Sequence, residues 1–231
     1  MHSVNALKSR KNPEFRVNDW IMDSGAFSQI NAHGKFTLSN EAYMDQILRF
    51  MGQGTLRAAV CQDWMCEPFM LEKTGKTVQE HQELTVTSFC TLSEWSLVPI
   101  LPVLQGFTPD DYCRHLAMYG EGLVEGAWVG VGSVCKRNGN PDAIEDVLLA
   151  IKSCRPDLRL HGFGLKIQAL ERGTVRQLLE SADSMAWSFA HRMEMGNGHD
   201  PRRALEYAAK VQSIIDQPVF VQEQLFKWWK E

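Results

Sequence analysis

The feature that most constrains the fold is a repeating order in which a short apolar run is followed by a segment with helical periodicity. Chains in which strands and helices alternate in this way build parallel sheets, because each helix carries the chain back to the same edge of the sheet. Ligands of such proteins gather at the carboxyl ends of the strands, so the residues that end the apolar runs are expected to face one cavity. These residues are Asp23, Asp63, Gln105, Gly132, His161 and Asp183.

The expected architecture is one α/β domain over residues 1–231, of the (β/α)8 or TIM-like barrel type. Such a barrel typically takes about 250 residues, so this chain has room for one core. Fewer strands are convincing in the sequence than a standard barrel needs. The segment 1–16 or the run 218–221 must supply the others, or the barrel is incomplete and trimmed at its N-terminus.

The spacing of apolar residues predicts the individual elements. Strands are expected over residues 19–22, 56–60, 97–104, 126–131, 158–163 and 184–189, the last with Asp183 at its start or just before it. Helices are expected over residues 39–51, 77–92, 108–119, 142–153, 167–179 and 201–215. Ser39 and Thr108 are expected to cap two of these helices, because their hydroxyl groups can accept hydrogen bonds from free backbone N–H groups. Trp228 and Trp229 are expected to pack against the body of the domain.

Composition and charge narrow the class of protein. Hydrophobic residues make up 44% of the chain and charged residues 23%, which is ordinary for a globular protein. No apolar run approaches the ~20 residues that span a bilayer, so no membrane association is expected. Scattered cysteines and an N-terminus without an apolar centre favour a cytoplasmic protein with reduced thiols. A net charge of −4 argues against unspecific binding to polyanions, although it permits a local basic patch.

The residues alone leave two interpretations of the carboxylates at the strand ends. Asp23 is followed by Ser24 and Gly25, so it either presents a carboxylate to a site or caps the next helix. Asp183 precedes Ser184 and suits a helix cap or a turn equally well. The glycines around residues 130–132 either let a flat ligand approach the backbone or serve close packing.

Six segments, taken in their order along the chain, resemble the motifs of a known family. They are DSGAFS, QDW, LQGF, WVGVGS, HGFGLK and ADSMAW, and they lie within about residues 19–192. The family is that of the tRNA-guanine transglycosylases, and the likeness is greatest to its DNA-acting branch, the 7-deazaguanine modification proteins called DpdA. The resemblance implies a TIM-like barrel enzyme that replaces guanine in DNA with a 7-deazaguanine derivative, such as 7-cyano-7-deazaguanine.

The resemblance also implies a role for each matching residue. Asp183 would attack the anomeric carbon and form a covalent glycosyl-enzyme. Asp23 would be the general acid toward the departing base and then the general base toward the incoming one. Asp63 would accept hydrogen bonds from the amino edge of the base, and Gln105 would meet its carbonyl. The other implied substrate-binding positions are Ser24, Gly130, Gly132 and Phe27, with Phe27 or else Trp64 stacking on the base.

The partners follow from what the chain shares with this family and what it lacks. Members that act on tRNA hold zinc with a CxCxxC pattern and a histidine, but this chain has no cysteine after Cys154. DNA is therefore favoured over tRNA, and no metal or other cofactor is expected. Lys136, Arg137 and Arg192 are expected at the rim of the site, where they would contact phosphates. Protein partners that supply further surface are compatible with this interpretation.

Other functions stay open at this point. The chain could act on tRNA, or it could be a non-catalytic subunit that holds nucleic acid. The presence of both Asp23 and Asp183 favours an enzyme over such a subunit, which has no chemical need for either. A third alternative is an unrelated barrel enzyme in which Lys166 forms an imine with a carbonyl substrate.

Overall fold

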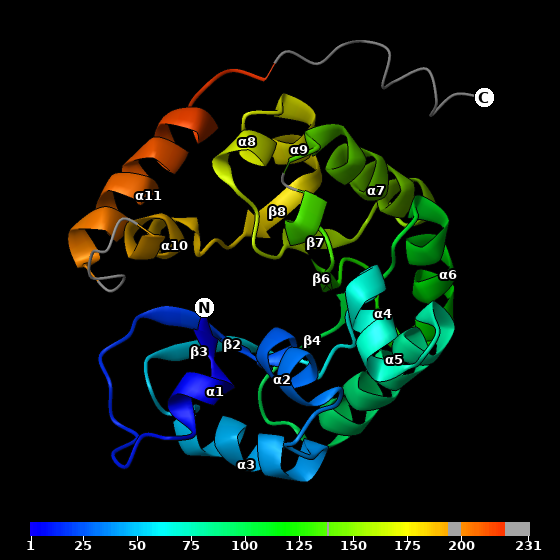
Figure 1. The fold of residues 1–231 in the computed structure, drawn as a ribbon, viewed down its shortest axis with the longest axis vertical. Coiled ribbons are helices and arrows are strands. Elements are labelled where there is room, and N and C mark those ends of the chain that lie inside the picture. The colour runs from blue at the N-terminus through cyan, green and yellow to red at the C-terminus, as the bar shows by residue number, and fades with distance from the viewer. Residues whose placement is uncertain (138, 194–199, 220–231) are drawn as a thin grey trace.

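The computed structural model describes residues 1–137, 139–193 and 200–219, and the side chains of Lys136 and of residues 190–193 are not part of the description. The strands are β1 (His2–Ser3), β2 (Asp19–Asp23), β3 (Thr55–Val60), β4 (Ile100–Leu101), β5 (Val103–Leu104), β6 (Trp128–Val131), β7 (Arg159–Gly162) and β8 (Leu179–Ala182). The predicted α/β class is confirmed, because helices separate most of these strands along the chain (Figure 1).

All strand pairings in the described part of the chain are parallel. One sheet has the order β1-β2-β3-β4 and the other has the order β5-β6-β7-β8. The strands of each sheet therefore follow the order of the sequence, and every strand points its carboxyl end to the same side. The described residues form no pairing between β1 and β8, which lie at the outer edges of the two sheets.

Pro102 marks the passage from one sheet to the other. It separates β4, which pairs with β3, from β5, which pairs with β6. Proline has no backbone N–H group, so it interrupts the ladder at this point. Its carbonyl group still accepts a hydrogen bond of 2.8 Å from the backbone N–H group of Gly130. The single run expected over residues 97–104 thus contributes a short strand to each sheet.

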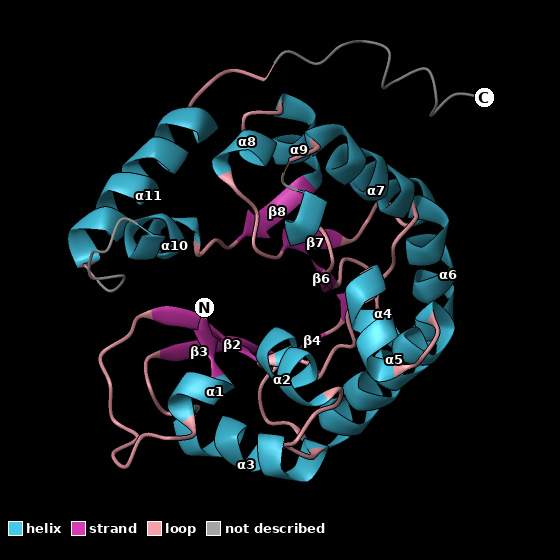
Figure 2. Ribbon diagram, in the orientation of Figure 1, coloured by secondary structure: helices cyan, strands magenta, loops and turns pink. Residues whose placement is uncertain are grey.

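Helices surround the strands on the outside of the molecule (Figure 2). They are α1 (Val4–Leu7), α2 (Ala26–His33), α3 (Asn40–Phe50), α4 (Pro68–Thr74), α5 (Val78–Trp95), α6 (Pro109–Tyr119), α7 (Pro141–Cys154), α8 (Ile167–Leu170), α9 (Gly173–Leu178), α10 (Ala186–Met193) and α11 (Pro201–Ile215), with the 3-10 turns η1 (Gly120–Gly122) and η2 (Cys135–Arg137). The predicted caps are confirmed, since Ser39 accepts from the N–H group of Ala42 and Thr108 from that of Asp111. None of the described helices is both long enough and apolar enough to cross a membrane.

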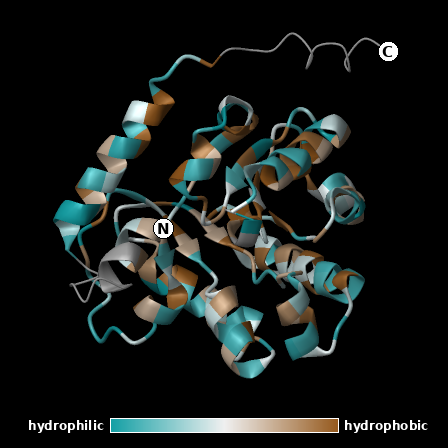
Figure 3. Ribbon diagram, turned by 45° about the horizontal axis from the view of Figure 1, so that its top comes forward, coloured by the Kyte–Doolittle hydropathy of each residue, from teal (hydrophilic) through white to brown (hydrophobic). Residues whose placement is uncertain are grey.

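The hydrophobic core has two large clusters of buried residues, one behind each sheet, and a smaller third cluster that includes Ile30 of α2 and Met70 of α4. The first joins β2 and β3 to α1, α3 and α5, with Tyr43 and Ile47 fully buried at its centre. The second joins β5, β6 and β7 to α6, α7 and α9, with Ile144 and Leu148 in the corresponding place. The outer helices carry both hydrophobic and hydrophilic residues in Figure 3, as expected of helices with one face against a sheet. Each buried aliphatic side chain stabilises the fold by about 1.5–3 kcal/mol.

The segment from residue 167 to residue 193 differs from the prediction. The strand expected over residues 184–189 is wrong, because helix α10 begins at Ala186. The strand of this region is β8, which ends directly before Asp183. The helix expected over residues 167–179 is in fact two short helices, α8 and α9.

The N-terminus supplies one of the strands that the sequence left to be found. His2 and Ser3 pair with Met22 and Asp23 of β2. The other candidate, the run 218–221, lies partly outside the described residues, as does the whole of the Trp228–Trp229 pair.

Candidate active site

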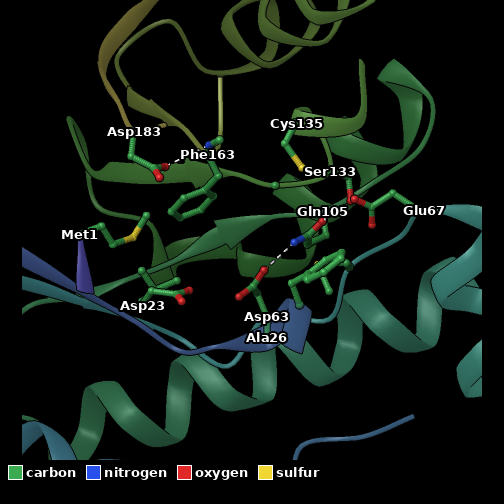
Figure 4. A pocket seen from close by; sticks show the side chains of 15 residues that line it. Met1, Asp23, Ala26, Asp63, Glu67, Gln105, Ser133, Cys135, Phe163 and Asp183 are labelled. Atoms are coloured by element: carbon green, nitrogen blue, oxygen red, sulfur yellow. Dashed lines mark hydrogen bonds between the residues drawn. The ribbon is translucent and has the colours of Figure 1, made fainter. Parts of the chain in front are cut away.

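A cavity of about 220 Å³ opens at the carboxyl ends of the strands. Cavities that take drug-sized ligands are larger, at about 300–1,000 Å³, so this volume suits a single flat base. Figure 4 shows side chains from both sheets around it, with Asp23, Asp63 and Asp183 among them. The other residues that line it include Phe27, Glu67, Gln105, Gly132, Ser133, Cys135 and Phe163.

Asp23 is the last residue of β2 and is held by the N-terminal segment of the chain. Gly25 follows with φ at +74°, a conformation that favours glycine, and its carbonyl accepts a 3.1 Å hydrogen bond from Asn5 Nδ2. Burial raises the pKa of Asp23, and the negative charge of Asp183 raises it further, while hydrogen bonds from Ser3 and the Gly25 backbone oppose the shift. A carboxyl group with a raised pKa is suited to giving and taking a proton near neutral pH.

Asp63 lies beyond the end of β3 and has both carboxylate oxygens occupied. Ser24 Oγ donates to Oδ1 at 3.2 Å, and Gln105 Nε2 donates to Oδ2 at 2.6 Å. Burial raises the pKa of Asp63 to about 7, with a further contribution from the charge of Asp23. Ser24 itself is fully buried and supports Asp63 instead of lining the cavity.

Gln105 is fixed by hydrogen bonds on its side chain and its backbone. Its side-chain oxygen accepts from Ser133 Oγ at 2.7 Å, and its backbone N–H donates to His115 Nδ1 at 2.8 Å. Burial lowers the pKa of His115 to about 4, so this imidazole is neutral and able to accept. Gly132 leaves room for the amide, because a Cβ atom there would lie 2.2 Å from Gln105 Nε2.

Asp183 follows β8 and is bound through one oxygen. Oδ1 accepts a 3.0 Å hydrogen bond from the backbone N–H group of Gly164 and lies 3.5 Å from His161 Nε2. The backbone N–H group of Asp183 donates to the Gly162 carbonyl at 3.3 Å, which continues the pairing of β8 with β7. Within the described part of the chain, Oδ2 has no hydrogen-bond partner, so this oxygen is free for a ligand in the cavity.

The aromatic residues and Gly130 take different places around the cavity. Phe27 lines it and is 44% exposed, which fits a side chain that can lie over a ligand. Trp64 instead packs edge-on against Phe36 and His81. Gly130 does not line the cavity. A Cβ atom on Gly130 would lie only 2.4 Å from Phe163 Cε2, so the glycine leaves space for the ring of Phe163. Phe163 therefore forms a wall of the cavity.

The basic residues that were expected at the rim are only partly described. Arg137 folds back, with its guanidinium group 5.3 Å from the ring centre of Phe107 and a hydrogen bond to the Phe107 carbonyl. Lys136 lies in η2 and Arg192 in α10, and their side chains fall outside the description. Contact between these residues and phosphates stays a prediction.

Sequence reasoning gave no role to three residues of the site, although His161 was among the strand ends expected to face the cavity. Phe163 and Ser133 line the cavity, and His161 contacts Asp183. All three stand in segments that carry the family resemblance, so their position in the motifs was the available signal. Among the side chains that the structure describes, no group of three from His, Cys, Asp or Glu could share a metal ion.

Comparison with known proteins gives one family. The family described as DpdA, DeoxyPurine in DNA protein A, matches residues 6–203, which is most of the chain. The match includes every strand end that faces the cavity. No curated protein matches the sequence.

Proposed function

This chain belongs to the DpdA family, whose role is the modification of DNA with 7-deazaguanine bases, and we propose that it exchanges guanine in DNA for such a base through a covalent aspartyl intermediate. One observation carries the proposal. Three carboxylates and one amide, from the ends of four different strand segments, surround a cavity of about 220 Å³. A double displacement needs a nucleophile, a proton donor and groups that read the base, and the cavity has a residue for each.

In the first step, Oδ2 of Asp183 attacks C1′ of the target nucleotide. The bond between C1′ and N9 breaks, and its electron pair leaves with the guanine. Asp23 gives its proton to the departing base, so that guanine leaves as a neutral molecule. The raised pKa of Asp23 supports this role, because it favours the protonated form before the reaction.

In the second step, the 7-deazaguanine derivative takes the place of guanine in the cavity. Asp23, now ionised, removes the proton from N9 of the incoming base. The N9 electron pair attacks C1′, and the bond between C1′ and Oδ2 breaks to restore the carboxylate of Asp183. Two displacements at the same carbon retain the configuration of the sugar.

Asp63 and Gln105 supply the recognition of the base. The Watson-Crick edge of guanine presents N–H donors beside one carbonyl oxygen, and a 7-deazaguanine has the same edge. Asp63 accepts from the donors, while the second hydrogen on Gln105 Nε2 meets the carbonyl. Adenine would place a lone pair opposite the carboxylate, so the site selects against it by leaving buried polar groups unpaired.

The target guanine must leave the base stack to enter a cavity at the strand ends. A flipped-out base or a single-stranded substrate satisfies this requirement. Phe27 then stacks on the base, a role that its partial exposure at the cavity supports.

Product analysis tests this function directly. Purified protein is incubated with 7-cyano-7-deazaguanine and either DNA or tRNA, and the nucleosides are then analysed by mass spectrometry. We expect the modified nucleoside in DNA from the wild type and from Asp45→Asn, which alters an exposed carboxylate on α3. Asp183→Asn should give no product and no covalent protein–DNA complex on a denaturing gel. Product from Asp183→Asn would overturn the mechanism, and product in tRNA alone would replace DNA as the substrate.

A further inference from the structure

We propose that His161 is a positioning residue that holds the nucleophilic carboxylate of Asp183 through its Nε2–H group, with Ser181 and Trp128 fixing its tautomer. The inference rests on the proposed function, because it assumes that Asp183 is the attacking group. His161 belongs to β7, and its side chain is only 2% exposed. A histidine in such a place would ordinarily serve packing alone, but its two ring nitrogens both face polar groups.

Packing fixes the plane of the imidazole. The ring of Trp128 lies edge-on at 5.7 Å, and that of Phe163 lies edge-on at 4.9 Å. His161 and Ser181 are also direct partners in the pairing of β7 with β8. The ring therefore has little freedom to turn, and each nitrogen keeps one neighbour.

The hydrogen-bond chain and the carboxylate of Asp183 together favour one position for the ring proton. Trp128 Nε1 lies 3.1 Å from Ser181 Oγ, and an indole N–H group can only donate. Ser181 Oγ lies 2.9 Å from His161 Nδ1 and has one hydrogen to give. When that hydrogen points to Nδ1, the proton of the neutral imidazole is on Nε2. The opposite tautomer would set the lone pair of Nε2 against the carboxylate of Asp183, which is unfavourable.

The contact with Asp183 completes the argument. His161 Nε2 is buried without a hydrogen-bond partner within normal distance, and the nearest acceptor is Asp183 Oδ1 at 3.5 Å. Such contacts are often long in the absence of substrate and shorten in the reacting complex. Gly164 donates to the same oxygen at 3.0 Å. Two donors on Oδ1 fix the plane of the carboxylate and leave Oδ2 as the attacking oxygen.

Two substitutions separate the donor from the rest of the side chain. In His161→Gln, the amide nitrogen can take the place of Nε2 and still donate to Asp183. In His161→Asn, the shorter amide can reach only the place of Nδ1, so the donor to Asp183 is lost. We expect His161→Asn to lower kcat by about 10- to 100-fold, because a small displacement of a reacting group costs a rate factor of this order. KM for DNA and for the base should stay within about 2-fold of the wild type, since His161 is buried and does not line the cavity.

The expected result for His161→Gln is rescue to within a few-fold of the wild-type kcat. Equal losses in the two variants would show that the imidazole matters only for packing, and this would overturn the proposal. An unchanged kcat in His161→Asn would also overturn it. Melting temperatures of both variants identify any variant that fails to fold.

The tautomer has a readout that does not depend on activity. Nitrogen NMR of protein with labelled histidine should show a proton on Nε2 and a bare Nδ1 for His161. Trp128→Phe keeps an aromatic ring but removes the indole donor, and Ser181→Ala removes the link to Nδ1, so both should weaken this preference. A proton found on Nδ1 in the wild type would contradict the hydrogen-bond chain. If Asp183→Asn keeps full activity, the proposed function fails instead, whatever the tautomer of His161.

Discussion

At the scale of single residues, the proposed role of Asp63 in base recognition comes with a cost to the stability of the fold. Its pKa in the folded protein is about 7, above the 3.8 of an unperturbed aspartate, chiefly because of burial. A group whose pKa is raised by folding binds a proton more tightly in the folded state. The fold is therefore most stable below the unfolded pKa, and this contribution is lost as the pH rises from about 4 to about 7.

Replacing Asp63 with Asn should stabilise the fold at alkaline pH and abolish base exchange. Asn can still accept from Gln105 and donate to Ser24, so the local hydrogen bonds survive without a buried charge. We expect the free energy of unfolding at pH 8 to rise by up to a few kcal/mol, since each unit of pKa shift corresponds to about 1.4 kcal/mol. At pH 4 the gain should vanish. Urea denaturation at pH 8 and at pH 4 measures the free energy of unfolding, with Asp45→Asn as the control. An equal gain in stability at the two pH values would refute the link to the ionisation of Asp63.

The residues of the site were predictable from the sequence to different degrees. Asp23, Asp63 and Gln105 could be found because each follows an apolar run that forms a strand. His161 was expected to face the cavity because it ends an apolar run, but it is buried beside the cavity, and its contact with Asp183 depends on the register between β7 and β8. Register joins residues that are distant in the sequence, so the pattern of the chain alone does not contain it.

At the scale of elements, the residue that follows strand β6 shows how a glycine leaves room for a neighbouring side chain. A Cβ atom on Gly132 would meet the amide of Gln105 at 2.2 Å, and this amide cannot move without breaking its bonds to Asp63 and Ser133. Gly132→Ala should therefore displace Gln105 and raise KM for the incoming base by about 10-fold or more, because a base with an unpaired edge binds weakly.

The matched control for this substitution is Gly139→Ala. A Cβ atom there meets nothing within 4 Å, and the backbone conformation does not require glycine. Steady-state kinetics with varied base, together with thermal unfolding, separates loss of recognition from loss of fold. A normal KM in Gly132→Ala would show that the position of Gln105 does not govern base binding.

The elements that were predicted wrongly lie where the sequence pattern is weakest. Strand β8 reads Leu-Glu-Ser-Ala, with partly buried and exposed residues in alternation, so it lacks the apolar run that marks the other strands. The helix expected over 167–179 is divided before Gly173, where a Cβ atom would lie 2.7 Å from Val219 Cγ1. A contact with a segment so distant in the sequence leaves no sign in the local periodicity, and glycine itself has a low helix propensity.

At the scale of the whole molecule, the site joins the two halves of the chain. Asp23 ends strand β2 of the first sheet and Asp63 comes after strand β3 of the same sheet, whereas Asp183 follows the second sheet. The alternation of strands and helices predicted the parallel order, because each strand pairs with its neighbour in sequence. The bounds of strand β1 could not be predicted, because a strand of two residues is too short to show a periodic pattern.

A ligand in the cavity contacts both halves, so its binding should stabilise the whole molecule in one transition. At 100 times its Kd, a ligand that binds only the folded state adds about 2.7 kcal/mol. For a chain of this size, 1 kcal/mol shifts the melting temperature by about 2–4 °C. We therefore expect 7-cyano-7-deazaguanine to raise the melting temperature by roughly 5–10 °C, and adenine to leave it unchanged.

The same measurement of melting temperature on two variants tests whether the increase comes from binding in the cavity. Asp63→Asn sets an amide donor against the donors of the base, so its melting temperature should not respond to 7-cyano-7-deazaguanine. Asp45→Asn lies on the outer helix α3 and should respond as the wild type does. An equal response to adenine and to the deazaguanine would mean that Asp63 and Gln105 do not read the base edge. A response split into two transitions would mean that the ligand contacts only one of the two sheets.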